Sequence, residues 1–224
     1  MAGSWDRART IGGAICLIGA PLALLVGDLL QIDLIEYDDN QKLVDNVFDH
    51  PDRWLAANAL LMVGFTLLVG AVLVIAARLR NDADGYGLVG GSLTVIGLMA
   101  GAGIVTIQGP VLWLIAHQDQ NPEAMLELLD AGENSGRFFA IYLVGLAFFV
   151  GTLVLAAGLW RGRAAPVGVP VLLAIGVVLA FVGGPLEVVA ASIVGDVALL
   201  AGLGWLGWLV LREGGVVGEG SAPG

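Results

Sequence analysis

The sequence predicts an all-α integral membrane protein that crosses the bilayer with six helices. The first observation is composition: 58% of the 224 residues are hydrophobic, only 13% are charged, and the mean hydropathy is +0.88. A soluble domain of this size carries about twice that share of charged residues. The second observation is that apolar segments on the order of 20 residues, the length that crosses a bilayer, recur along the chain. The third is that the basic residues collect on one side of this pattern.

The apolar segments define six expected spans. They lie at residues 10–32, 54–77, 88–116, 138–160, 166–183 and 186–211. The last two form one apolar run that is too long for a single tilted helix. Gly183-Gly184-Pro185 is the place where this run can turn. Residues 1–212 are therefore expected to form a single transmembrane domain, and residues 213–224 a flexible cytoplasmic tail.

The distribution of charge predicts the orientation. Seven of the ten basic residues lie at the edges of spans that face one side: Arg7, Arg9, Arg78, Arg80, Arg161, Arg163 and Arg212. The loops at 33–53 and 117–137 are acidic and account for most of the net charge of −10. Because cytoplasmic loops carry an excess of Lys and Arg, both termini are expected in the cytoplasm and both acidic loops outside it. The expected location is the plasma membrane.

The spans are expected to form three repeated helical hairpins. Ile18-Gly19, Ile96-Gly97 and Ile175-Gly176 recur at nearly constant spacing, one pair in the first span of each hairpin. The two acidic loops each predict a short amphipathic helix. In the first loop, Val44, Val47 and Phe48 form the apolar side of the helix. In the second loop, Asn121 and Pro122 are suited to the start of a helix, and Gly132 is suited to its end. The third hairpin lacks such a helix.

Four polar residues near the acidic ends of the spans are the candidate site: Asp28, Gln108, Glu187 and Asp196. A carboxylate at the centre of a membrane helix costs about 2.5–3.5 kcal/mol on insertion scales, and less near the interface. Two interpretations stay open. The four residues could line an outward-facing polar vestibule for a cation, a proton or a polar solute. They could instead sit at headgroup depth or pair with Arg53 and Arg137 as structural contacts.

Other polar residues favour structural roles. Arg53 and Arg137 begin their spans from the acidic side and are expected to form structural ion pairs with Asp49, Asp52 or Glu133. His50 and His117 lie in separate loops without the spacing of a zinc site, so an interfacial position is favoured over metal binding. Neither histidine lies within a span, as a haem ligand would. No cofactor and no metal are expected.

The segment His50-Pro51-Asp52-Arg53-Trp54-Leu55, with the span after it and Arg78-Leu79-Arg80 at the end of that span, resembles a family of proteins. This is a group of uncharacterised six-helix integral membrane proteins of bacteria, of actinobacterial type. The resemblance covers residues 45–100 well and the rest of the chain in hydropathy. It implies six helices and the plasma membrane, and it brings no activity and no site residues.

The sequence favours a non-catalytic integral membrane protein, an accessory or structural subunit that packs with a protein partner or with copies of itself. It contains no nucleophile constellation, His-Glu-x-x-His motif or nucleotide fingerprint, and its inner loops are short. Nucleic acid is not an expected partner, since neither face carries a polybasic run. The alternative is a small solute or ion transporter or channel, with the four candidate residues lining its acidic vestibule.

Overall fold

A computed structural model describes residues 2–35, 39–80, 83–117, 121–133, 136–183 and 188–219. Every regular element in these ranges is a helix, which confirms the all-α class. The helices are α1 (Ala2–Gln31), α2 (Asn40–Asp49), α3 (Pro51–Leu79), α4 (Asp84–His117), α5 (Pro122–Glu133), α6 (Gly136–Arg161), α7 (Gly168–Gly183) and α8 (Val189–Glu219).

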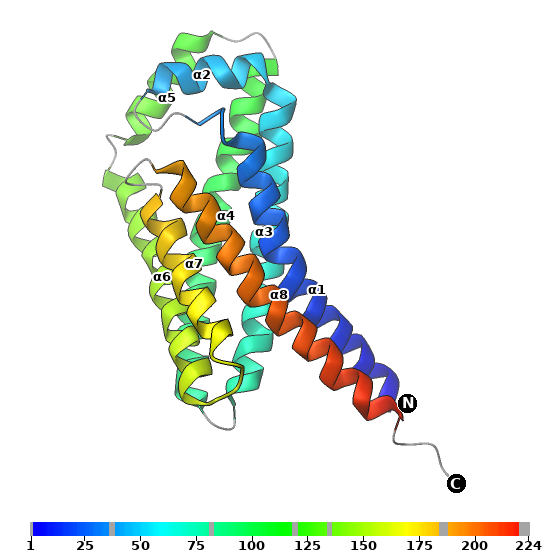
Figure 1. The fold of residues 1–224 in the computed structure, drawn as a ribbon. Coiled ribbons are helices and arrows are strands. Elements are labelled where there is room, and N and C mark those ends of the chain that lie inside the picture. Colours follow the sequence, from blue (N-terminus) through cyan, green and yellow to red (C-terminus); the bar gives the residue numbers. More distant parts are fainter. Residues whose placement is uncertain are drawn as a thin grey trace.

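The long helices form a closed ring. Each packs against the next in the order α1, α3, α4, α6, α7 and α8, and α8 packs back against α1. Figure 1 shows α2 and α5 lying across one end of this ring, while α1 and α8 run together past the other end, where both termini lie. The ring is closed by the contact between its first and last helices. We call the α2/α5 end the capped end and the opposite one the terminal end.

Five of these helices contain stretches long and apolar enough to cross a membrane: Arg7–Gln31, Pro51–Leu79, Asp84–His117, Leu143–Arg161 and Ala190–Glu213. The expected span at 166–183 corresponds to α7, which has 16 residues. At 1.5 Å per residue α7 is about 24 Å long, less than the hydrocarbon core of about 30 Å. The count of six spans therefore stays a prediction. The division of the apolar run is clear, because α7 ends at Gly183 and α8 begins at Val189.

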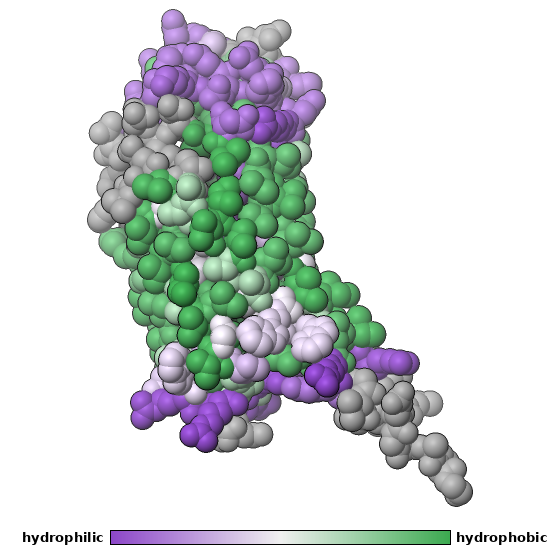
Figure 2. Space-filling model, in the orientation of Figure 1, coloured by the Kyte–Doolittle hydropathy of each residue, from purple (hydrophilic) through white to green (hydrophobic). Residues whose placement is uncertain are grey.

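The surface matches a protein surrounded by lipid. Figure 2 shows an apolar belt between a polar cap at the α2/α5 end and a polar rim at the terminal end. Large apolar side chains point outward along the belt; Leu73, Leu88 and Met99 are each more than 60% exposed. A soluble protein would cover such a surface, and a bilayer does so here.

A second, smaller apolar core holds α2 and α5 over the ring. Val44 and Val47 of α2 and Met125 of α5 are fully buried, and they pack with Leu34 and Trp54 beneath them. Both loop helices expected from the sequence are present. The N-terminus of α2 is capped by Asp39, whose carboxylate accepts a hydrogen bond from the backbone N–H of Lys42.

Glycines allow the ring helices to approach closely. A Cβ on Gly97 of α4 would collide with the backbone of Phe148 on α6, whereas Gly101, one turn further on, faces the ring of Phe65 on α3. Gly97 and Gly101, four residues apart on α4, thus face different neighbouring helices. Around Gly103, on the same helix, no atom lies within 4 Å of the position that a Cβ would take. Close contact at Gly97 therefore depends on the missing side chain.

Gly97→Ala is predicted to destabilise the protein by about 1–3 kcal/mol, because the added methyl group must push α6 away from α4. The matched control is Gly103→Ala, which adds the same group to the same helix in open space. That variant is expected to be neutral or stabilised by up to about 1 kcal/mol. Thermal unfolding of the purified chain in detergent measures both. Equal melting temperatures for the two variants would contradict the α4–α6 contact.

Candidate functional site

Two acidic residues meet on the contact that closes the ring. Asp28 lies near the capped end of α1, and Asp196 lies inside α8. The two helices are antiparallel (Figure 1) and pack tightly, with Gly207 of α8 against Leu17 and Ile18 of α1. Asp196 is eleven residues before Gly207, and Asp28 is ten residues after Ile18, so the two aspartates come to the same height.

The carboxyl groups of Asp28 and Asp196 lie within interaction distance of each other. Each aspartate follows a glycine that fixes its helix against a neighbour. A Cβ on Gly27 would lie 2.8 Å from Cδ2 of Leu61 on α3, and one on Gly195 would lie 2.8 Å from the carbonyl oxygen of Gly176 on α7. With one side of each helix held in this way, both carboxyl groups are directed into the α1/α8 contact.

Gln31 completes the polar cluster. Its side-chain amide donates a hydrogen bond to Oδ1 of Asp28 at 3.3 Å, and only 8% of the residue is exposed. Gln31 is the last residue of α1, so this amide lies between the acidic pair and the capped end. We call Asp28, Gln31 and Asp196 the acidic cluster.

Asp196 is more buried than its neighbours and incompletely satisfied. Only 6% of the residue is exposed, and its Oδ2 atom has no hydrogen-bond partner among the residues that the structure describes. An unsatisfied buried polar atom costs about 1–3 kcal/mol, and more when it carries charge. A carboxyl group in such a position marks a place where the fold gives up stability, which is typical of functional sites in membrane helices.

The structure separates the other predicted vestibule residues from this pair or leaves them undescribed. Gln108 is half-buried on α4, which packs mainly against α3 and α6 rather than in the α1/α8 contact. Glu187 lies outside the described residues. The structure therefore brings together two of the four candidates, Asp28 and Asp196, and adds Gln31 to them.

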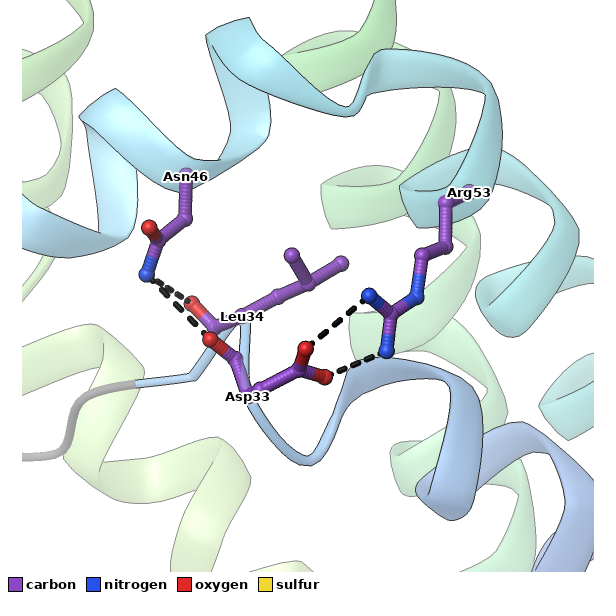
Figure 3. Close-up of polar contacts among 4 residues, drawn as sticks. All are labelled: Asp33, Leu34, Asn46 and Arg53. Atoms are coloured by element: carbon purple, nitrogen blue, oxygen red, sulfur yellow. Dashed lines mark hydrogen bonds and ion pairs between the residues drawn. The ribbon is translucent and has the colours of Figure 1, made fainter.

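Arg53 forms an ion pair at the capped end, with a partner that the sequence analysis did not name. Its guanidinium group meets both carboxylate oxygens of Asp33, on the turn after α1, and the Nη1–Oδ2 distance is 3.0 Å. On the same turn the amide of Asn46 donates to the carbonyl oxygens of Asp33 and Leu34, at 3.5 and 3.2 Å (Figure 3). The side chain of Arg137, the other expected ion-pair residue, lies outside the described part.

These contacts hold the turn that follows the acidic cluster. The guanidinium group of Arg53 lowers the pKa of Asp33 from its usual range, chiefly through its hydrogen bonds to the carboxylate. Arg53 begins α3 and Asn46 belongs to α2, so the end of α1 is tied to both neighbours. We call Asp33, Asn46 and Arg53 the turn clamp.

The two histidines occupy structural positions. His50 joins α2 to α3, and the ring of His117 stacks on Trp113 with centroids 4.9 Å apart. The indole N–H of Trp113 donates to Oδ1 of Asp52 at 3.2 Å. Within the described ranges, His, Cys, Asp and Glu side chains form no group of three or more that could hold a metal ion.

Sequence reasoning did not find Gln31, Asn46 or the pairing of Asp33 with Arg53. One signal was present: Gly27-Asp28 and Gly195-Asp196 are two Gly-Asp pairs in otherwise apolar segments. A glycine that permits close approach, followed by a carboxylate, would have favoured a contact between these two spans. The partner of Arg53 depends on the turn after α1, which no local pattern specifies.

Taken together, the apolar belt, the helical ring and the buried acidic cluster define a helical membrane protein with a polar site between its first and last helices. The chain matches a family described as "Domain of unknown function (DUF4386)" over residues 11–212, and it belongs to that family. No curated protein and no solved structure matches the chain. The expected resemblance to a family of unknown function is thus confirmed at that level, while the His50–Leu55 signature and the actinobacterial type stay predictions.

The turn clamp predicts a specific pH dependence of stability. The folded pKa of Asp33 is lowered below its unfolded value of about 4, so the clamp stabilises the fold above that value and loses its effect as pH falls through the folded pKa. Asp33→Asn is expected to lower the melting temperature at pH 7 and to match the wild type at strongly acidic pH. Asp45→Asn, on exposed α2, is the control. A constant difference between wild type and Asp33→Asn at every pH would contradict this account.

Proposed function

We propose that this chain is a small ion- or proton-handling membrane protein, of the transporter or channel class, that works through the acidic cluster. The observation that carries the proposal is that Asp28 and Asp196 come to the same height on the α1/α8 contact, where Asp196 is buried with one carboxylate oxygen unsatisfied. Ionisable residues inside membrane segments are expensive, and they commonly mark ion pathways and proton relays.

The depth of the pair supports exchange with one side of the membrane. Asp28 lies three residues from the end of α1, about 5 Å at the rise of an α-helix. On the other side, α8 continues for 17 residues from Asp196 to the end of its apolar span at Glu213, about 25 Å. The site is therefore a short distance from the capped end and far from the terminal end, as a vestibule opening at the capped end requires.

The accessory or structural subunit favoured by the sequence remains the second candidate. It is supported by the layer that α2 and α5 form over the ring. The side-chain amide of Asn40 on α2 donates to Asp130 on α5 at 3.0 Å, and Glu123 and Glu127 are exposed on the outer side of α5. A fixed, acidic, solvent-facing layer suits the docking of a basic protein partner or of a second copy. It does not explain a buried acidic pair, which is why we rank it second.

The architecture we propose for this function is three repeated hairpins with six spans. The hairpin partners α1 and α3, α4 and α6, and α7 and α8 are packed neighbours. The recurring glycines support the repeat, because Gly19 faces Leu67 of α3, Gly97 faces Phe148 of α6 and Gly176 faces Leu199 of α8. Each repeated glycine thus contacts the second helix of its own hairpin. In this arrangement α7 is the sixth span, and the bilayer adapts to its shorter length.

We further propose that the terminal end faces the cytoplasm and the capped end faces outward in the plasma membrane. The excess of arginine at the terminal end supports this orientation. It predicts that, in a Cys16→Ser background, a cysteine at Gln41 on α2 reacts with an impermeant thiol reagent in intact cells. A cysteine at Asp84, at the start of α4, is expected to react only after the cells are permeabilised. The reverse pattern would overturn the orientation.

The proposed function predicts that Asp196→Asn abolishes ion or proton flux. Purified chain is reconstituted in liposomes, and fluorescent dyes report H⁺, Na⁺ and K⁺ movement under an imposed gradient. Flux is expected for the wild type and is expected to fall to the level of empty liposomes for Asp196→Asn and Asp28→Asn, because an amide cannot take up or release the charge. Glu127→Gln makes the same chemical change on exposed α5 and is expected to keep wild-type flux. Equal flux in all variants would count against the proposal and leave the accessory function.

A further inference from the structure

We propose that the ligand of the acidic cluster is a proton, shared by Asp28 and Asp196 and exchanged with the capped end past Gln31. This inference rests on the proposed function and deepens it, since it selects a proton over a metal cation and names the route. It follows from three features of the structure: the two carboxyl groups at the same height on the α1/α8 contact, the residues packed beside them, and the position of Gln31.

The position of the two carboxyl groups favours a shared proton. Two carboxylates have only acceptor atoms, so Asp28 and Asp196, which come to the same height on the α1/α8 contact, can form a hydrogen bond only when one of them carries a hydrogen. A metal cation would instead be ligated by both carboxyl groups and would hold their oxygens apart on its two sides, each about 2.3–2.6 Å away for an ion such as Ca²⁺. Within the described residues no group of three or more His, Cys, Asp and Glu side chains forms, so a shared proton fits the pair better than a metal cation.

The glycines that precede the two aspartates pack against small or apolar residues. From α3, Ala57 and Leu61 lie against Gly27; from α7, Ala180 and Gly176 lie against Gly195. Among the described residues, the side-chain hydrogen bond to Asp28 comes from Gln31, and neither aspartate takes part in an ion pair. No described basic side chain from α3 or α7 pairs with the aspartates. Two ionised carboxylates at Asp28 and Asp196 would therefore repel each other in a medium that screens charge poorly. One shared proton removes that repulsion.

Gln31 occupies the way out of the cluster. Its amide donates to Asp28, and its backbone carbonyl accepts from the N–H groups of Leu34 and Ile35 in the following turn. The turn clamp holds that turn, where the guanidinium group of Arg53 meets the exposed carboxylate of Asp33 (Figure 3). Asp28, Gln31 and the clamp therefore follow one another along the chain toward the capped end. We assign Gln31 as the positioning residue that links the pair to solvent.

The exchange step balances without any further reactant. On release, the O–H bond of the protonated carboxyl breaks, and the proton passes to water at the capped end to give hydronium. Two carboxylates remain on α1 and α8. On uptake, hydronium returns the proton to one carboxyl oxygen, and the hydrogen bond between the aspartates forms again. The unsatisfied Oδ2 of Asp196 provides a free acceptor atom for this return.

Infrared spectroscopy of the full chain in lipid nanodiscs tests the proton directly, through the C=O absorption of protonated carboxyl groups. At neutral pH the wild type is expected to show such a band, and the band is expected to be absent from the double variant D28N/D196N. Asp196→Glu keeps the carboxyl group and is expected to keep a shifted band. Monodisperse elution of each variant in detergent verifies folding. A spectrum of the double variant that matches the wild type would overturn the proposal.

Two further measurements address the cation and the route. If Na⁺ or K⁺, compared with choline, removes the band from the wild type, a metal cation replaces the proton and the proposal is wrong. After transfer to D₂O, Gln31→Leu is expected to slow the isotope shift of the band by roughly fivefold, the scale of one lost hydrogen bond. Gln41→Leu, on exposed α2, is the control and is expected to exchange at the wild-type rate. Exchange at the wild-type rate in Gln31→Leu would overturn the route.

The outcome is separable from that of the proposed function. A carboxyl band that behaves as expected, together with no flux in liposomes, would support a proton site in a protein that does not transport. Flux that depends on Asp196 without a protonated carboxyl band would support transport and overturn the shared proton.

Discussion

The structure depends on close contact between helix backbones. In a bilayer the lipid is as apolar as the side chains, so helices associate through tight packing and through polar contacts rather than through hydrophobic burial. In this chain the tight packing comes from glycine. Gly97 lies against Phe148, Gly176 against Gly195, and Gly207 against Ile18, each on a different helix contact of the ring. Because these contacts are short, the neighbouring side chains are fixed in position, and the acidic cluster is one result.

The polar residues of the chain follow the two ends of the ring. At the terminal end, Arg78 of α3 donates to the carbonyl oxygen of Ala164 at 3.0 Å and pairs with Glu213 of α8 at 2.6 Å. At the capped end, Arg53 pairs with Asp33. Exposed pairs of this kind contribute little to stability, but they fix the positions of chain segments that they join. Arg78 fixes the end of α8, and Arg53 fixes the end of α1, so the two helices that carry the aspartates are each held at one end.

Much of the fold could be predicted from the sequence because hydropathy and charge are local properties. Five of the expected spans, the two loop helices with Val44, Val47 and Met125 on their buried sides, and the end of α7 at Gly183 all follow from short windows. The acidic cluster could be predicted from the sequence only in part. Asp28 and Asp196 could be named as unusual, because a carboxylate in an apolar segment is visible in the sequence. Their pairing depends on the contact between α1 and α8 that closes the ring, and no local pattern encodes that contact. Gln108 lies on α4, away from it.

The closing contact differs from the other five contacts of the ring in its chemistry. It joins the first and last helices, so no single loop connects α1 to α8. It is also the contact at which carboxyl groups of two ring helices meet. When the pair holds a proton, a hydrogen bond joins the helices; when it does not, two charges push them apart at about 4 kcal/mol for unit charges 4 Å apart at an intermediate dielectric. In the proposed function, protonation therefore acts on the contact that closes the ring, and a change there bears on the packing of both the first and the last helix.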